Sequence, residues 1–174
     1  PKRQEARVID LESAIRRRRL LQWLALSPGV GLFGGLSACQ QTPSVYDLEV
    51  SRDVGCFCCH VWTEVMQASG RFRVTMMDAP DLPALKQKLG VPAGLGACHT
   101  AVAEGYVIEG HVPAEDILRL LTERPKGIRG IAVPGMPRGS PGMEQSSGVV
   151  DDFTVIAFDA NGVQSDYNYH NGNS

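Results

Sequence analysis

The chain has 174 residues, of which 43% are hydrophobic and 21% charged, and its formal net charge is −2. Residues 39–174 hold 10 Lys and Arg against 16 Asp and Glu, a net charge of −6, because the basic residues gather near the N-terminus. This part of the sequence has the length of one domain and no basic stripe, so we expect no nucleic acid among its partners.

The first 38 residues have the pattern of an export signal. A basic run, Arg16 to Arg19, precedes an apolar run of 17 residues from Leu20 to Leu36. That run is short for a transmembrane helix, which needs roughly 20 apolar residues. A basic region, a short apolar region and small residues at the end are typical of a signal peptide. The alternative is a helix that anchors the protein in a membrane, with Cys39 as an ordinary residue.

Two motifs in this segment indicate the export pathway and the attachment of the protein to a membrane. Arg17-Arg18-Arg19-Leu20-Leu21 resembles a twin-arginine signal, although an arginine run also suits an ordinary secretion signal. Leu36-Ser37-Ala38-Cys39 resembles a bacterial lipobox, whose cysteine is acylated so that the acyl chains hold the protein at a membrane. We therefore expect residues 1–38 to be a signal peptide and Cys39 to be lipidated. The protein would then be periplasmic, attached to the envelope only by its lipid anchor.

The remaining sequence predicts alternating strands and helices after a short tether at 39–44. Strands are expected where β-branched and apolar residues alternate, and helices where apolar residues recur at helical spacing and Asp, Pro or Gly mark the ends. The expected order is strand 45–50, helix 61–70, strand 72–77, helix 81–89, hairpin strands 100–102 and 106–109, helix 113–124, loop 134–148, and strands 153–158 and 163–169 about an Asn161-Gly162 turn. This is the order of an α/β, thioredoxin-like sandwich over residues 45–170, with a C-terminal loop and β-hairpin as an extension.

Three thiols lie within four residues after the first strand. Cys56 and Cys59 form a C-x-x-C pair with Cys58 between them. At a helix start, free backbone amides and the helix dipole lower a thiol pKa, which suits dithiol chemistry. Thiolates are also soft ligands that favour Cu(I), with Zn(II) second. A redox pair needs two thiols and a metal site benefits from three or four, so the middle cysteine favours metal.

The fourth thiol of the set, Cys98, precedes the predicted strand at Thr100. In a thioredoxin-like fold the loop before that strand lies against the C-x-x-C and usually carries a cis-proline. Here Ala97-Cys98-His99-Thr100 occupies the loop without a proline. We therefore expect Cys98 to approach Cys56 and Cys59. The alternative is two disulfides that cross-link a small exported domain.

Some of the histidines are candidates for additional metal ligands. His99 could ligate a metal or only orient its loop. His60 could ligate a metal or be a solvated surface residue. His111 is assigned a structural role, and His170, in a tail expected to be mobile, none.

Met66, Met76 and Met77 lie in a predicted helix and strand and are assigned to the core. Met136 and Met143 lie in the Pro- and Gly-rich loop, where exposed thioethers suit Cu(I) or fill an apolar gap.

Four motifs in one order resemble the CopG family of bacterial exported metal-binding proteins, known from copper-resistance systems. They are Gly55-Cys56-Phe57-Cys58-Cys59-His60-Val61-Trp62, Ala97-Cys98-His99-Thr100-Ala101, Gly105-Tyr106-Val107-Ile108-Glu109-Gly110-His111-Val112-Pro113, and residues 132–137 with 140–144. The resemblance implies a thioredoxin-like fold and a periplasmic copper protein with metal ligands at Cys56, Cys58, Cys59 and Cys98. Phe57 departs from the glycine usual in the family, and its ring could shield the site or narrow it for a multinuclear cluster.

The favoured hypothesis is a periplasmic protein that sequesters, transfers or redox-cycles copper, as Cu(I) or Cu(II), in copper homeostasis or resistance. Its partners would be copper ions and periplasmic copper transport or efflux proteins. The alternative is a thiol–disulfide oxidoreductase with Cys56 as nucleophile, Cys59 as resolving thiol and Cys98 as relay. Zinc fits less well, because thiols separated by one or no residues differ from the C-x₂-C pairs of zinc modules.

Overall fold

The computed structural model describes residues 44–173. The predicted signal peptide at 1–38, the predicted lipidation at Cys39 and most of the predicted tether lie outside the described residues. Within 44–173, no helix is both long enough and apolar enough to cross a membrane.

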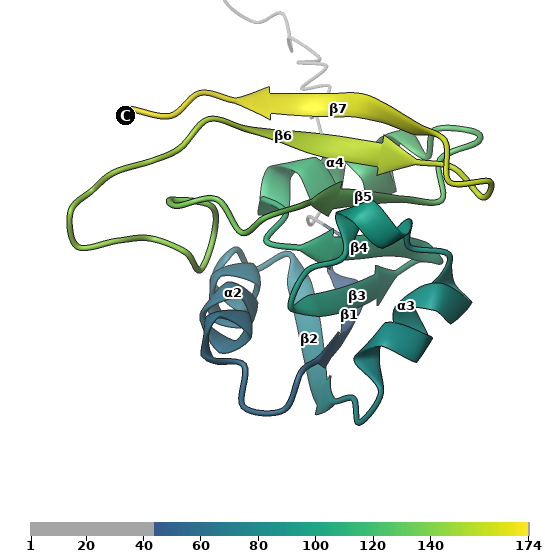
Figure 1. The fold of residues 1–174 in the computed structure, drawn as a ribbon, viewed down its shortest axis with the longest axis horizontal. Helices are drawn as coiled ribbons and strands as arrows, with labels where there is room; N and C mark the ends of the chain where they lie inside the picture. Colours follow the sequence, from purple (N-terminus) through teal and green to yellow (C-terminus); the bar gives the residue numbers. More distant parts are fainter. Residues whose placement is uncertain (1–43, 174) are drawn as a thin grey trace, which may run out of the picture. The chain divides into compact units, whose positions relative to one another are not determined.

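The described chain folds into one seven-stranded mixed sheet with helices packed against it (Figure 1). The elements are β1 (Tyr46–Arg52), α2 (Phe57–Ala68), β2 (Phe72–Asp78), α3 (Leu82–Leu89), the 3-10 helix η1 (Ala93–Leu95), β3 (His99–Ala103), β4 (Tyr106–Gly110), α4 (Ala114–Glu123), β5 (Gly130–Val133), β6 (Phe153–Phe158) and β7 (Gln164–His170). The order across the sheet is β2-β1-β3-β4-β5-β6-β7. Pairs β1/β2 and β4/β5 are parallel, and the other four are antiparallel. The predicted mixed α/β class is confirmed.

β5 is a strand that the sequence analysis did not predict. It has four residues, all buried, so it shows neither the length nor the alternation by which strands are recognised. It lies parallel to β4 and antiparallel to β6 and so joins the C-terminal hairpin to the sheet. Gly130 is needed there, since a Cβ atom would lie 2.2 Å from the carbonyl oxygen of Val107 and 2.6 Å from the Phe158 ring.

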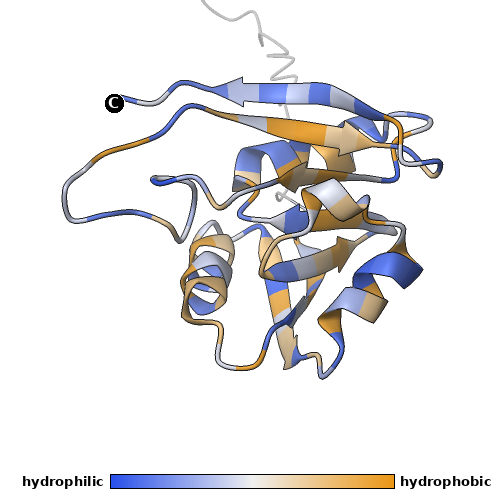
Figure 2. Cartoon of the chain, viewed as in Figure 1, coloured by the Kyte–Doolittle hydropathy of each residue, from blue (hydrophilic) through white to orange (hydrophobic). Residues whose placement is uncertain are grey.

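Both faces of the sheet are covered at β4, β5 and β6, because neighbouring residues of these strands enter two separate apolar clusters. The larger cluster contains residues of α2 and α4, among them Trp62, Met66 and Ile117. The smaller one packs Val91 and Leu95, around η1, against Val107, Ala132 and Phe158. Figure 2 shows the result at the sheet's C-terminal end, where β6 is largely apolar and the edge strand β7 largely polar.

The structure corrects two assignments of side chains. Met77 was assigned to the core, but it is 50% exposed, because β2 is an edge strand with its second face open to solvent; Met66 is buried and Met76 half-buried. His170 was expected in a mobile tail. Instead it ends β7, stacks on Phe153 at 4.7 Å, and places Nε2 2.6 Å from Oδ2 of the buried Asp116 on α4.

Candidate metal centre

The first turn of α2 carries three of the clustered thiols. The helix begins at Phe57, four residues before the predicted start, with Cys56 as its N-cap residue. Cys59 is buried, whereas Cys56 and Cys58 are half-buried. The turn that leads into the helix is fixed by Arg52, whose Nη1 donates to the Cys56 carbonyl at 2.8 Å and whose Nε donates to Asp78 at 2.8 Å. The thiols therefore lie at the positive end of a helix that is held to β1 and β2.

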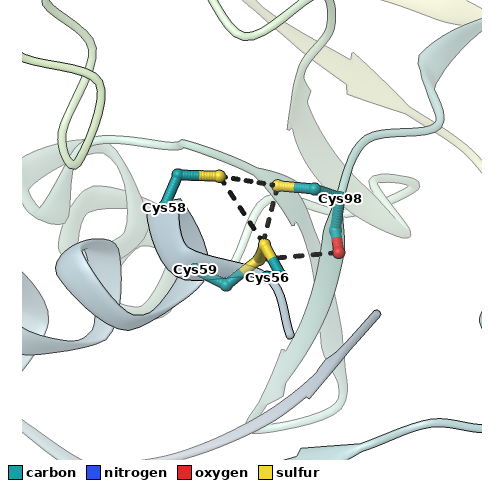
Figure 3. A group of neighbouring side chains, drawn as sticks. All are labelled: Cys56, Cys58, Cys59 and Cys98. Atoms are coloured by element: carbon teal, nitrogen blue, oxygen red, sulfur yellow. Dashed lines mark hydrogen bonds between the residues drawn. A yellow bond between two sulfur atoms is a disulfide. The ribbon is translucent and has the colours of Figure 1, made fainter. Parts of the chain in front are cut away.

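Cys98 reaches this turn from the other side, because β3 begins directly after it and pairs with β1. Arg52 and His99 are partners in that pairing, and Asp53 N–H donates to the Cys98 carbonyl at 3.3 Å. Cys98 Sγ lies 3.4 Å from Cys59 Sγ and 3.7 Å from Cys58 Sγ, and all four sulfur atoms lie within 4.8 Å of one another (Figure 3). The predicted approach of Cys98 is confirmed.

Two of the four sulfurs are bonded to each other. Cys56 and Cys59 form a disulfide, while Cys58 and Cys98 are free thiols. The described residues thus hold a single disulfide, and the alternative of two cross-linking disulfides does not apply to this state. The pocket is half-oxidised: one C-x-x-C disulfide lies against a pair of free thiols.

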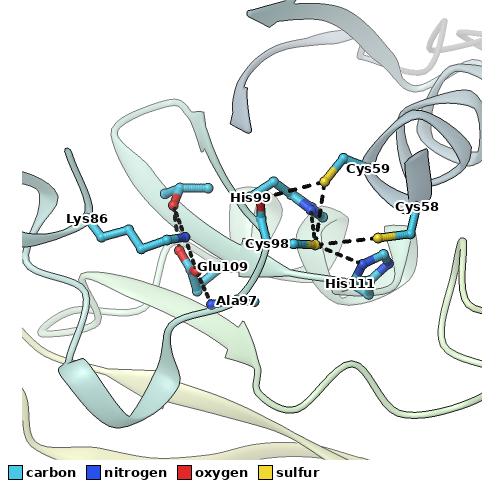
Figure 4. Close-up of polar contacts among 9 residues, drawn as sticks. Cys58, Cys59, Lys86, Ala97, Cys98, His99, Glu109 and His111 are labelled. Carbon is cyan, nitrogen blue, oxygen red and sulfur yellow. Dashed lines mark hydrogen bonds and ion pairs between the residues drawn. The ribbon is translucent and has the colours of Figure 1, made fainter. Parts of the chain in front are cut away.

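Two imidazoles extend the sulfur cluster beyond Cys98 (Figure 4). His99 Nδ1 lies 3.5 Å and His111 Nε2 3.3 Å from Cys98 Sγ. These three residues form a second group whose ligand atoms lie within 4.8 Å of one another. Cys98 is common to both groups. The centre therefore brings together four sulfur atoms, two of them in free thiols, and two imidazole nitrogens, with Cys98 next to both imidazoles.

The position of His111 corrects its assignment to a structural role alone. The hairpin register pairs Thr100 with Glu109, so counting two residues outward sets Cys98 opposite His111. That register was implicit in the predicted turn at Glu104-Gly105. His111 Nδ1 lies 2.8 Å from the Pro141 carbonyl, which can only accept, so Nδ1 carries the proton and Nε2 directs a lone pair at Cys98.

Burial keeps the groups around Cys98 neutral. Burial, together with a smaller contribution from the neighbouring Cys58, raises the pKa of the Cys98 thiol to about 12. Burial also lowers the pKa of His99 to about 3, helped by the charges of His111 and Lys86. The pKa of His111 is lowered by burial, against the opposing effects of the Pro141 carbonyl and Glu144. At neutral pH both imidazoles therefore keep a lone pair free, whereas a metal ion must displace the Cys98 proton.

The other predicted ligands differ in their access to this centre. His60 is exposed and belongs to neither ligand group. Phe57 is 79% exposed. Its ring therefore does not shield or narrow the thiol pocket, unlike the role suggested by the sequence.

The Pro- and Gly-rich loop comes close to the thiols at one turn. A Cβ on Gly142 would lie 2.7 Å from the backbone nitrogen of Trp62 and 3.1 Å from the Cys58 carbonyl oxygen, so only glycine allows this approach. Met143 follows directly and is half-buried, with its N–H donating to Ser140 at 2.8 Å. Met136 is 40% exposed. Of the two loop methionines, Met143 is therefore the one in the turn that packs on α2.

The lowered pKa of His99 predicts that acid destabilises the metal-free protein. The folded pKa of about 3 lies below the ordinary value of 6.5, so the unfolded chain takes up a proton at a higher pH than the folded chain. The stability is complete above about pH 6.5 and is lost as the pH falls toward about 3, with about 2 kcal/mol gone by about pH 5. Chemical denaturation at several pH values measures this, and His99→Asn should remove most of that loss. His60→Asn, at an exposed position, is the control and should keep the wild-type profile; an unchanged pH dependence in His99→Asn would contradict the assignment.

Comparison with known proteins places the chain in a family. A family model described as "Protein of unknown function, DUF411" matches residues 95–143, the segment from Leu95 through the Cys98 loop to Met143. No functionally curated protein matches the chain.

Two solved structures are similar over nearly all of their own length. One, "Copper resistance protein copG- Form 2", has a TM-score of 0.68 and 40% identity, with 74% of this chain and 100% of that chain covered. The other, "Copper resistance protein copG- Form 1", has a TM-score of 0.67 and 40% identity, with 74% and 98% covered. Because the 40% identity extends over 98–100% of these two solved chains, this chain belongs to the CopG family of copper resistance proteins.

Proposed function

We propose that the protein binds copper through Cys56, Cys58, Cys59 and Cys98, with His99 and His111 as nitrogen donors. The observation that carries the proposal is the convergence of four sulfur atoms within 4.8 Å, next to two imidazoles whose burial favours the neutral form. Thiolate and imidazole donors suit Cu(I), and a half-buried pocket limits its access to water. The copper resistance proteins that share 40% identity support this choice of metal.

The fold supports the same proposal. The order β2-β1-β3-β4, with β1 parallel to β2 and β3 antiparallel to both β1 and β4, supports a thioredoxin-like classification of residues 46–123. In such a fold a C-x-x-C at the start of the helix after β1 faces the loop before β3. The loop at 134–152 and the β6–β7 hairpin would then be an extension that brings Pro141 and Met143 to the site. Met143 is the better placed of the loop thioethers for an additional copper ligand, and exposed His60 and Met136 are weaker candidates.

The redox state of Cys56 and Cys59 would set how many donors copper meets. As a disulfide, the pair leaves two thiols and two imidazoles; reduction by two electrons and two protons adds two more thiols. In the reverse direction, two Cu(II) ions could each accept one electron as the two thiolates form the disulfide, giving two Cu(I). The predicted leader suggests a periplasmic, lipid-anchored protein that sequesters, transfers or redox-cycles copper there. Periplasmic copper transport or efflux proteins would deliver or receive the ion.

An anaerobic Cu(I) titration against a coloured Cu(I) chelator tests copper binding. The fully reduced protein should compete for Cu(I) more strongly than the protein with the Cys56–Cys59 disulfide, because two thiolate donors are restored. Cys98→Ser should weaken Cu(I) binding by more than the roughly 10–100-fold typical of losing an outer-shell partner, since Cys98 belongs to both ligand groups. His60→Ala, next to the cluster but exposed, is the control and should bind as the wild type does. Equal affinity in the reduced, oxidised and Cys98→Ser proteins would rule out the proposed site.

A thiol–disulfide oxidoreductase is the second candidate, favoured by the Cys56–Cys59 disulfide at a helix start. A substrate thiolate would attack Cys56 Sγ and release Cys59 as a thiolate; the substrate's second thiolate would then free Cys56 and leave the substrate oxidised. Cys98 is a poor relay, because burial holds its pKa at about 12.

Turnover without metal tests this second activity. We expect the chelator-treated, oxidised protein to oxidise a dithiol peptide, Cys56→Ser to lack the activity, and Cys58→Ser to keep it. The loss of two peptide thiols per protein disulfide reduced can be followed with a thiol reagent on the separated peptide. If Cys56→Ser retains the wild-type rate, or the wild type shows none, the second candidate is removed.

A further inference from the structure

A buried carboxylate lies behind the Cys98 loop and is not part of either ligand group. Glu109 on β4 is fully buried. Its Oε1 accepts from the Ala97 N–H at 2.6 Å, and its Oε2 accepts from Thr100 Oγ1 at 2.6 Å. Lys86 on α3 forms an ion pair with Oε1 (Figure 4). It also donates to Thr100 Oγ1 at 2.8 Å. Glu109, Lys86 and Thr100 together are called the carboxylate clamp below.

The clamp is costly if its only role is stability. Removing a carboxylate and an ammonium from water carries a penalty that their attraction repays only with good geometry, and apolar residues of similar volume often serve as well. The side chain of Lys86 is only 13% exposed, so water does little to relieve that penalty. What an apolar pair could not supply is an acceptor for the Ala97 N–H, which is bonded to a side chain rather than to the sheet.

The bonds of the clamp enclose Cys98. Ala97 precedes the cysteine and Thr100 follows it by two residues, so one carboxylate holds the backbone N–H of Ala97 on one side and the side-chain hydroxyl of Thr100 on the other. On the opposite side, Asp53 N–H donates to the Cys98 carbonyl at 3.3 Å. Gly110 leaves room for this packing, since a Cβ there would lie 2.8 Å from Ala97 Cβ and 2.7 Å from the Val133 carbonyl oxygen.

We propose that Glu109 is a positioning residue for copper binding, which fixes the segment from Ala97 to Thr100 so that Cys98 Sγ stays within reach of Cys58 and Cys59. The inference rests on the proposed copper-binding function. Glu109 acts through two hydrogen bonds to the loop and does not touch the metal. Lys86 balances its charge and orients Thr100. Without the clamp the loop keeps its cysteine but loses the alignment of the sulfur with its partners.

Two double variants isolate the acceptor from the buried charge. Lys86→Met with Glu109→Gln removes both charges and keeps an oxygen for the Ala97 N–H. Lys86→Met with Glu109→Leu removes both charges and the acceptor, at similar volume. In the metal-free proteins, amide hydrogen exchange should show Ala97 protected in the Gln form and unprotected in the Leu form. Ile108, a buried β4 residue, should stay protected in both. Cu(I) affinity should fall roughly 10–100-fold from the Gln form to the Leu form.

The outcomes separate the inference from the function on which it rests. Equal Cu(I) affinity in the two double variants, with the wild type binding Cu(I), would overturn positioning by Glu109 and leave copper binding intact. Loss of Ile108 protection together with that of Ala97 would overturn it too, since the clamp would then serve the whole fold. If the Leu form does not fold, Thr100→Val removes one bond of the clamp, and unchanged Cu(I) affinity there would overturn the inference. A wild type that binds no Cu(I) would contradict the proposed function, whereas Ala97 exchange would still report whether the clamp orders the loop.

Discussion

The antiparallel pairing of β1 with β3 is the constraint on which the candidate metal centre depends. β1 leads into the turn and helix that carry Cys56, Cys58 and Cys59, and β3 begins just after Cys98. Because Arg52 and His99 are partners in the pairing, segments about 40 residues apart in sequence are brought side by side at one end of two adjacent strands. The thiols are thus held by backbone hydrogen bonds rather than by the disulfide alone, and reduction of Cys56–Cys59 need not separate them.

The C-terminal part of the chain completes this centre from outside the part of the sheet formed by β1 to β4. β5 extends the sheet beyond β4, and β6 and β7 continue it, so the long loop between β5 and β6 has both ends fixed. One turn of that loop packs on α2 at Gly142 and offers the Pro141 carbonyl to His111. This contact determines which nitrogen of His111 faces Cys98. A distant loop therefore controls the chemical form of a candidate ligand.

Sequence predicted the parts of the centre that follow from local pattern and strand order. The cysteine cluster is visible as spacing, and the approach of Cys98 follows from the order of strands. His111 was missed because its place depends on the hairpin register, which sequence implies only when residues are counted outward from the turn. The outward direction of Phe57 depends on how α2 sits on the sheet, and neither composition nor spacing encodes that rotation. β5 and the exposure of Met77 depend on the position of each strand in the sheet, which is a tertiary property.

Before a metal binds, Cys98, His99 and His111 are uncharged at neutral pH. Burial favours the protonated thiol of Cys98 and the uncharged rings of His99 and His111, so copper would meet neutral donors and release a proton on binding.

The central claim is that Cys98 is a copper ligand shared by the sulfur and the imidazole groups. X-ray absorption spectroscopy at the copper edge, on reduced protein loaded with Cu(I), tests this most directly. The account predicts a coordination shell dominated by sulfur with a nitrogen contribution, and a loss of sulfur scattering in Cys98→Ser; a shell of nitrogen and oxygen alone, unchanged by that substitution, would contradict it.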